Sequence, residues 1–127
     1  MSELAKKQPA PERGGRSVTI LVVADLLNVA RCAASTRFYF DLIQDLVDRD
    51  REGFRKYGQN LETHDGRDTL ADLYQEITDA MQYARKDLEE GVIEGRGEDR
   101  ISVIYAELCR IARTILEIKE ARDESRD

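Results

Sequence analysis

Acidic side chains recur at helical spacing in residues 65–88, and they are the residue type that a divalent cation requires. The stripe runs beside an apolar helix face and consists of Asp68, Asp72, Glu76, Asp79 and Tyr83. At about 100° per residue, the four members from Asp72 onward lie within roughly 60° of one another. Carboxylates this close repel each other unless something neutralises them, and Mg²⁺ prefers several oxygen ligands. Taken alone, such a stripe more often faces solvent, so the rest of the sequence must decide between the two interpretations.

The preceding stretch, residues 36–58, carries a second acidic stripe. Its members follow one another at i, i+4, i+7 and i+11 and are Asp41, Asp45, Asp48 and Glu52. Asp50 differs because it falls on the apolar side, between Val47 and Phe54, where a carboxylate is costly unless it is paired or coordinated. If the two helices are antiparallel, residues 45–52 face residues 72–79. Four inward carboxylates would then form a cage for Mg²⁺ or Mn²⁺, a site suited to phosphoanhydride cleavage.

Basic and aromatic side chains near these stripes are candidates for holding a nucleotide. Arg49, Lys56 and Arg67 suit phosphate groups, arginine being able to bind them with two parallel hydrogen bonds. Tyr57 and Tyr83 can stack on a base or bind a sugar. The alternatives are a surface pair of Asp45 with Arg49 and tyrosines that belong to the core.

The elements that must position these residues are helices. Apolar residues recur at three- and four-residue steps over residues 17–34, 36–58, 68–90 and 99–122, and no second strand candidate accompanies the β-branched residues near Val18. We therefore expect an all-α protein with a four-helix bundle-like protomer. Residues 1–16 hold two prolines and two glycines among charges and predict a disordered N-terminal tail, leaving residues 17–127 as a single domain.

Expected helix boundaries follow from capping residues. Ser17 is the expected N-cap of the first helix, Ser35 or Thr36 can cap the second, and Gly58 suits the residue that ends the second. The third helix is expected to end before Gly91. The first and last helices carry more apolar surface than four short helices bury in a monomer, which predicts a homo-oligomer.

Composition excludes some partners. The formal net charge of −6 argues against binding polymeric nucleic acid. The longest apolar run, residues 20–24, is too short to span a membrane. Two distant cysteines without CxxC spacing and a polar N-terminus without a signal peptide predict a cytoplasmic protein. The single histidine, His64, is expected to be a surface residue of a loop.

The combined motif resembles a known family. Asp45-x3-Arg49-x3-Gly53, then Lys56-Tyr57-Gly58 and Leu61, then Asp65-Gly66-Arg67-Asp68 and Asp72-x3-Glu76-x2-Asp79-x3-Tyr83, is similar to small phage- and prophage-encoded helical proteins. These resemble in turn the MazG-like all-α nucleoside triphosphate pyrophosphohydrolases. The segment from Glu76 to Asp79 matches the family's ExxD motif. The family's EExxE motif is not present as written, and acidic residues between Asp45 and Glu52 stand in its place.

The resemblance implies a Mg²⁺-dependent enzyme that cleaves a nucleoside triphosphate to the monophosphate and pyrophosphate, acting as a dimer or higher oligomer. It implies Asp45, Asp50, Glu76 and Asp79 as metal ligands, Asp72 as the residue that orients or activates water, and Arg49, Lys56, Tyr57, Arg67, Asp68 and Tyr83 around the substrate. Two alternatives stay open: a non-catalytic helical oligomer with a structural or adaptor role, and a related domain that binds a nucleotide without cleaving it.

Overall fold

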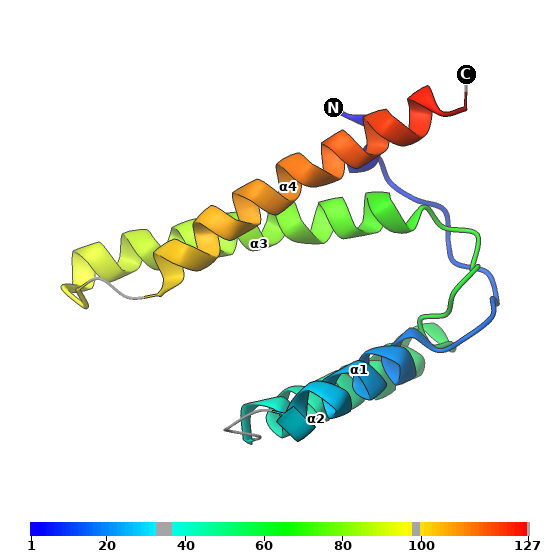
Figure 1. Ribbon diagram of the computed structural model, residues 1–127, viewed down its shortest axis with the longest axis horizontal. Helices are drawn as coiled ribbons and strands as arrows, with labels where there is room; N and C mark the ends of the chain where they lie inside the picture. Colours follow the sequence, from blue (N-terminus) through cyan, green and yellow to red (C-terminus); the bar gives the residue numbers. More distant parts are fainter. Residues whose placement is uncertain (33–36, 98–99, 127) are drawn as a thin grey trace. The chain divides into compact units, whose positions relative to one another are not determined.

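The protein is all-α, with its helices packed in pairs (Figure 1). The computed structural model describes residues 1–32, 37–97 and 100–126. Within these ranges lie a short 3-10 helix, η1 (Glu3–Ala5), and four α-helices: α1 (Val18–Cys32), α2 (Arg37–Tyr57), α3 (Thr69–Glu94) and α4 (Ile101–Glu124). None of the described segments is a β-strand, which confirms the predicted fold class, and none of the described helices has the length and hydropathy of a membrane span.

The chain divides into two compact units. The α3–α4 unit comprises Met1–Pro9 and Asp68–Asp127, and the α1–α2 unit comprises Ala10–Arg67. In each unit two helices pack against each other, α1 with α2 and α3 with α4. The single domain and the four-helix bundle predicted from the sequence stay predictions, because each unit is described by itself.

In the α1–α2 unit, α1 begins and α2 ends at the residues that the sequence predicts. The Ser17 hydroxyl accepts a hydrogen bond from the Ile20 N–H at 3.5 Å, as expected of an N-cap. Gly58 ends α2 with a φ of 74°, a left-handed conformation that glycine adopts without a Cβ penalty. The proposed caps of α2, Ser35 and Thr36, lie outside the described residues.

Much of the apolar surface of this pair is exposed when the chain is taken alone. Of the described residues in α1 and α2, only Ala30 is buried. Ile20 on α1 is 68% exposed and Phe38 on α2 is 73% exposed. Two helices alone offer each other one face, so side chains on their other faces stay in solvent.

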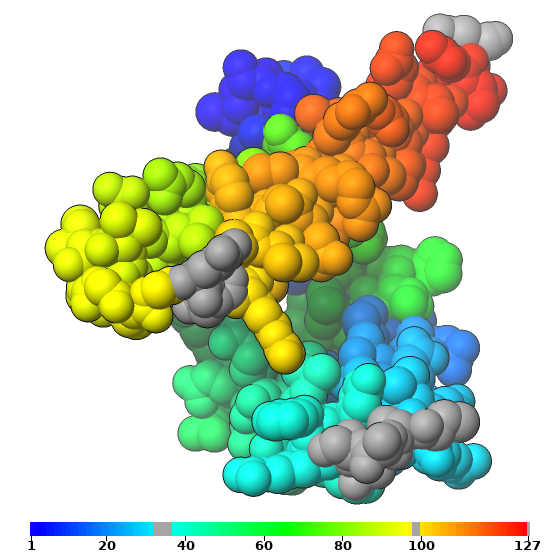
Figure 2. All heavy atoms as spheres, turned by 60° about the vertical axis from the view of Figure 1, so that its left-hand side comes forward, coloured from blue at the N-terminus to red at the C-terminus, as the bar shows by residue number. Residues whose placement is uncertain are grey.

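In the α3–α4 unit, the two helices and η1 close on a small core. Leu4, Ala71 and Ile115 form its centre, with Leu70, Tyr74, Ile77 and Ile111 packed around them. Asp68 caps α3, its carboxylate accepting a hydrogen bond from the Ala71 N–H at 3.1 Å. The N-terminal residues lie against the start of α3 and the later part of α4 in Figure 2.

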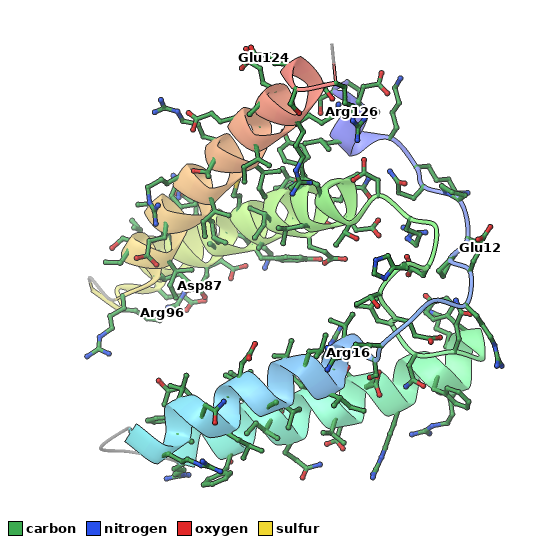
Figure 3. The ribbon with its side chains drawn as sticks, turned by 45° about the vertical axis from the view of Figure 1, so that its right-hand side comes forward. Glu12, Arg16, Asp87, Arg96, Glu124 and Arg126 are labelled. Atoms are coloured by element: carbon green, nitrogen blue, oxygen red, sulfur yellow. The ribbon has the colours of Figure 1, made fainter. Side chains whose placement is uncertain are left out.

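The predicted end of α3 before Gly91 is wrong, because the helix continues to Glu94. Gly95 ends it in a left-handed conformation, with a φ of 69°. Arg96 then folds back along α3, donating to the Asp87 carbonyl oxygen at 3.0 Å and pairing with the Asp87 carboxylate at 3.3 Å (Figure 3). A Cβ on Gly91 would lie 3.2 Å from the Arg96 guanidinium. Gly91 therefore makes room for this contact within the helix.

Residues 1–16 make specific contacts, which differs from the disordered tail predicted from composition. Leu4 is 1% exposed, and the Gln75 side chain donates to the carbonyl oxygens of Leu4 and Lys6 at 3.0 and 2.8 Å. Residues 10–16, here called the N-terminal strap, follow the loop after α2 in antiparallel fashion. Glu12 and Arg16 mark its course in Figure 3. The local composition of residues 1–16 is typical of a flexible tail. It does not reveal these contacts, because the contacting residues lie far away in the sequence.

Backbone hydrogen bonds hold the strap in place. The Gly15 N–H donates to the Thr63 carbonyl oxygen at 2.5 Å, and the Thr63 N–H donates to the Arg16 carbonyl oxygen at 2.8 Å. A Cβ on Gly14 would overlap the Thr63 carbonyl oxygen, so only glycine fits there. The strap thus forms one wall of the α1–α2 unit.

Candidate functional site

The main candidate site is a pocket of the α1–α2 unit with a volume of about 520 Å³, here called the loop pocket. α2 supplies one side, the loop after Gly58 the second, and α1 and the strap the remainder. Its lining is Pro11, Thr19, Leu46, Arg49, Asp50, Gly53, Tyr57, Gln59, Asn60, Leu61, Asp65 and Arg67. The pocket therefore combines an apolar lining with two carboxylates and two guanidinium groups, the composition of a small-molecule site.

Four of the residues singled out from the sequence line this pocket: Arg49, Asp50, Tyr57 and Arg67. Asp50 is half-buried, as its place on the apolar side of α2 predicts, and its Oδ2 accepts a hydrogen bond from Asn60 Nδ2 at 2.7 Å. Arg49 makes no ion pair among the described residues, so the alternative pairing with Asp45 is not formed. Its guanidinium is available to an anionic ligand.

The remaining substrate candidates lie in different surroundings. The Lys56 ammonium stands over the Tyr57 ring, 5.2 Å from its centroid, a cation–π contact at the exposed end of α2. Tyr83 lies on α3 beside Asp79 around a shallow hollow of about 340 Å³. Asp68 uses its carboxylate to cap α3.

The predicted metal ligands are divided between the two units. Asp45 and Asp50 lie on α2, exposed and half-buried, whereas Glu76 and Asp79 lie on α3, both exposed. In the described part of the chain, neither Glu76 nor Asp79 has an ion pair or a side-chain hydrogen bond. Within either unit, the described residues bring no group of three His, Cys, Asp or Glu side chains together. The four-carboxylate cage therefore stays a prediction, as does the role of Asp72 in the first turn of α3.

Three polar side chains of the loop pocket received no site role from the sequence, although Asp65 belongs to the quoted motif. Asn60 binds Asp50, Gln59 Nε2 donates to the Pro11 carbonyl oxygen at 3.2 Å, and Asp65 is only 6% exposed. The Asp65 carboxylate accepts a hydrogen bond from the Arg67 N–H at 3.2 Å, which stabilises the turn at Gly66. The one available signal was the pair of amide side chains immediately after the glycine that ends α2.

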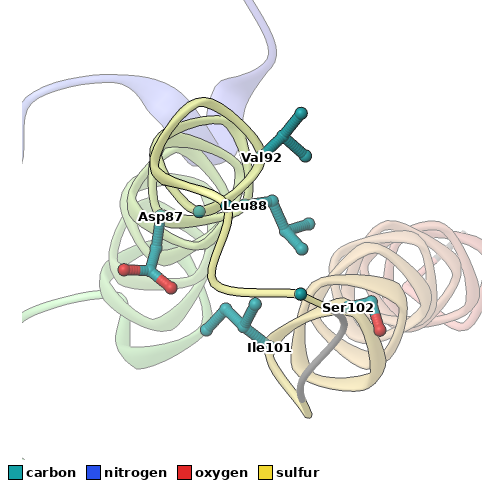
Figure 4. Close-up of a pocket in the computed structure, with 8 residues that line it drawn as sticks. Asp87, Leu88, Val92, Ile101 and Ser102 are labelled. Atoms are coloured by element: carbon teal, nitrogen blue, oxygen red, sulfur yellow. The ribbon is translucent and has the colours of Figure 1, made fainter.

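A second hollow, at the α3–α4 turn, offers less chemistry (Figure 4). Its volume is about 430 Å³, and its lining is largely aliphatic or glycine, including Leu88, Val92 and Ile101. Asp87 is the only ionisable residue among the described residues that line it, and Arg96 already pairs with that carboxylate. The loop pocket is therefore the better candidate for a charged ligand.

Comparison with known proteins finds no relative. No protein-family model matches the sequence, and neither a curated protein nor a solved structure gives a significant match.

Proposed function

We propose that the protein is a Mg²⁺- or Mn²⁺-dependent nucleotide pyrophosphohydrolase, which cleaves a nucleoside triphosphate to the monophosphate and pyrophosphate. One observation carries the proposal: the loop pocket gathers Arg49, Tyr57 and Arg67 of the motif that resembles this enzyme class, together with Asp50 of the acidic segment on α2. The pocket volume of about 520 Å³ lies within the range usual for small-molecule sites. The pocket supports nucleotide binding more directly than it supports cleavage.

The residues of the pocket suit the parts of a nucleotide. Arg49 and Arg67 supply guanidinium groups for phosphate oxygens, which arginine binds in a bidentate manner. Tyr57 is 69% exposed and presents a ring on which a base can stack. Leu46 and Leu61 provide apolar contact on the same lining.

Metal binding is assigned in this proposal to Asp45, Asp50, Glu76 and Asp79. Carboxylate oxygens are the donors that Mg²⁺ prefers, and three of the four are exposed side chains available to a cation. A bound metal would polarise the phosphate oxygens and lower the pKa of a coordinated water. Asp72 is assigned to orient that water.

The decisive experiment is incubation of the purified protein with a panel of NTPs and dNTPs plus Mg²⁺ or Mn²⁺, with detection of pyrophosphate. The expected result is that the native protein releases pyrophosphate. Glu76→Gln should lose this activity and keep the helical circular dichroism signal. Glu120→Gln, an exposed glutamate on α4, is the matched control. Absence of turnover together with absence of a metal-dependent rise in melting temperature contradicts the proposal.

A second candidate is a non-catalytic helical oligomer with a structural or adaptor role. Large exposed apolar side chains favour it, among them Ile20, Phe38 and Phe40 on the α1–α2 unit. It predicts a stable oligomer in sedimentation experiments without pyrophosphate release. Thermal stabilisation by a nucleotide and metal without turnover would indicate instead a domain that binds the nucleotide and leaves it intact.

A further inference from the structure

Two neighbouring amide side chains of the loop pocket are held by their nitrogen atoms. Gln59 Nε2 donates to the Pro11 carbonyl oxygen at 3.2 Å, and Asn60 Nδ2 donates to Asp50 Oδ2 at 2.7 Å. A backbone carbonyl and a carboxylate only accept hydrogen bonds, so the nitrogen of each amide must face its partner. The orientation of both amides is therefore fixed, and all four residues belong to the lining of the pocket.

The amide oxygens are the ends of these side chains that remain for a ligand. Gln59 Oε1 and Asn60 Oδ1 accept no hydrogen bond from the described residues. In the part of the chain that the structure describes, no buried side-chain nitrogen or oxygen atom lacks a partner, and both residues are half-buried. The two oxygens are therefore open to solvent, and a ligand in the pocket can reach them.

An amide of fixed orientation distinguishes nucleobases that a freely rotating amide does not. Cytosine and adenine present an amino N–H donor beside an acceptor nitrogen of the ring, whereas uracil presents a carbonyl acceptor beside a ring N–H donor. A free amide pairs with either order after a half-turn that exchanges its oxygen and its nitrogen. The amides of Gln59 and Asn60 cannot make that turn without giving up their bonds to Pro11 and Asp50.

The charge beside Asn60 decides which of the two orders is favoured. Its amide nitrogen is bonded to the Asp50 carboxylate, and a neutral amide leaves the negative charge of that group in place. A carbonyl oxygen of a base would be repelled by this carboxylate and by the two amide oxygens, because all of them are acceptors. An amino group supplies the missing donors, as in the known pairing of amide and carboxylate side chains with adenine and cytosine.

We infer that Gln59 and Asn60 determine the base specificity of the loop pocket. They select a nucleotide whose base carries an amino group, cytosine or adenine, over one that has a carbonyl group at the same position. The inference rests on the proposed function only in placing a nucleotide in this pocket. It requires neither a bound metal ion nor cleavage of the triphosphate.

CTP and UTP are the matched probes, because they differ only in the amino or carbonyl group of the base and in the ring nitrogen beside it. Both are titrated against the full-length protein in EDTA, so that neither metal binding nor turnover affects the result. CTP should bind about 10- to 100-fold more tightly than UTP, the usual discrimination by one well-placed pair of hydrogen bonds. ATP and ITP, a second pair with the same chemical difference, should give the same order.

Two substitutions test whether the amides supply this preference. Gln59→Met and Asn60→Leu keep the approximate side-chain volume and remove the hydrogen-bonding groups, so each should lower the ratio of the UTP and CTP dissociation constants about 2- to 10-fold. Gln44→Met is the matched control, because Gln44 is exposed on α2 and its amide bonds to Asp48 away from the pocket lining. Partial unfolding of a variant weakens the binding of both nucleotides equally and leaves the ratio unchanged.

The inference is overturned if the native protein binds CTP and UTP equally, prefers UTP or binds neither. It is also overturned if both variants keep the native ratio. Pyrophosphate release with Mg²⁺ is measured separately, so the two proposals can fail independently. Equal affinities with pyrophosphate release would refute the base specificity and keep the enzyme. A preference for CTP without pyrophosphate release would refute the enzyme and keep the base specificity.

Discussion

Leu4 is the largest fully buried side chain among the described residues. It packs with Ala71 and Ile115, and the Gln75 side chain donates to the carbonyl oxygens of Leu4 and Lys6. Leu4→Ala removes three carbon atoms from this contact. At about 0.8 kcal/mol per buried methylene, the loss of transfer free energy is roughly 2.5 kcal/mol. The cavity left behind extends the expected range to about 2–5 kcal/mol.

The short N-terminal segment can detach while the α3–α4 hairpin stays folded. The free energy of this detachment therefore determines how much Leu4→Ala changes the rate of proteolytic cleavage. Tryptic cleavage after Lys6 and Lys7 reports the detached population when detachment is fast relative to cleavage. A penalty of about 2.5 kcal/mol raises that population, and hence the cleavage rate, by between one and two orders of magnitude.

The matched control is Met1→Ala, because Met1 is 95% exposed. It should leave the cleavage rate and the denaturation midpoint unchanged. Leu4→Met conserves volume and should cost less than about 1.5 kcal/mol. If the free energies of unfolding of Leu4→Ala and Met1→Ala agree within about 0.5 kcal/mol, the buried position of Leu4 is refuted.

Three further outcomes are expected. Gly14→Ala should release the N-terminal strap, because a Cβ overlaps the loop backbone, and amide hydrogen exchange in residues 61–65 should then accelerate. Arg49→Ala should weaken triphosphate binding about 10- to 100-fold in an equilibrium titration, the loss of charge-assisted hydrogen bonds, whereas Arg51→Ala outside the pocket should have little effect. The hydrogen bond from Lys6 lowers the pKa of Glu3 below its ordinary value of 4.5, so its stabilising contribution is present above that pH and is lost as the pH falls through the lowered pKa. An NMR titration of the Glu3 carboxyl should show this midpoint, and Lys6→Met should return it to about 4.5.

Features set by nearby residues were predictable from the sequence. Ser17 caps α1 and Gly58 ends α2, since both effects act within one helical turn. Position on a helix face also placed Asp50 correctly on the half-buried side of α2. By contrast, the sequence predicted that α3 ends before Gly91, but Gly91 lies inside the helix. There the Arg96 guanidinium packs over it, and this contact cannot be read from the preference of glycine for helix ends.

Features set by distant residues were not predictable. The contacts of Leu4 with Ile115 and of Asn60 with Asp50 require the chain to fold back on itself, and no periodicity encodes such pairs. The candidate site was therefore predicted in part: its residues on α2 and Arg67 were identified, whereas the loop amides were not and Asp65 had no assigned role.

The position of Leu4 in the α3–α4 core has a consequence for synthesis of the protein on the ribosome. Leu4 precedes all four α-helices along the chain, whereas its partner Ile115 lies in the last of them, α4. The hairpin of α1 and α2 can form while the chain is still growing, since its contacts are local. The N-terminal segment must wait for α4 with its apolar side chain exposed. Completion of the α3–α4 core is therefore expected only after α4 has left the ribosome.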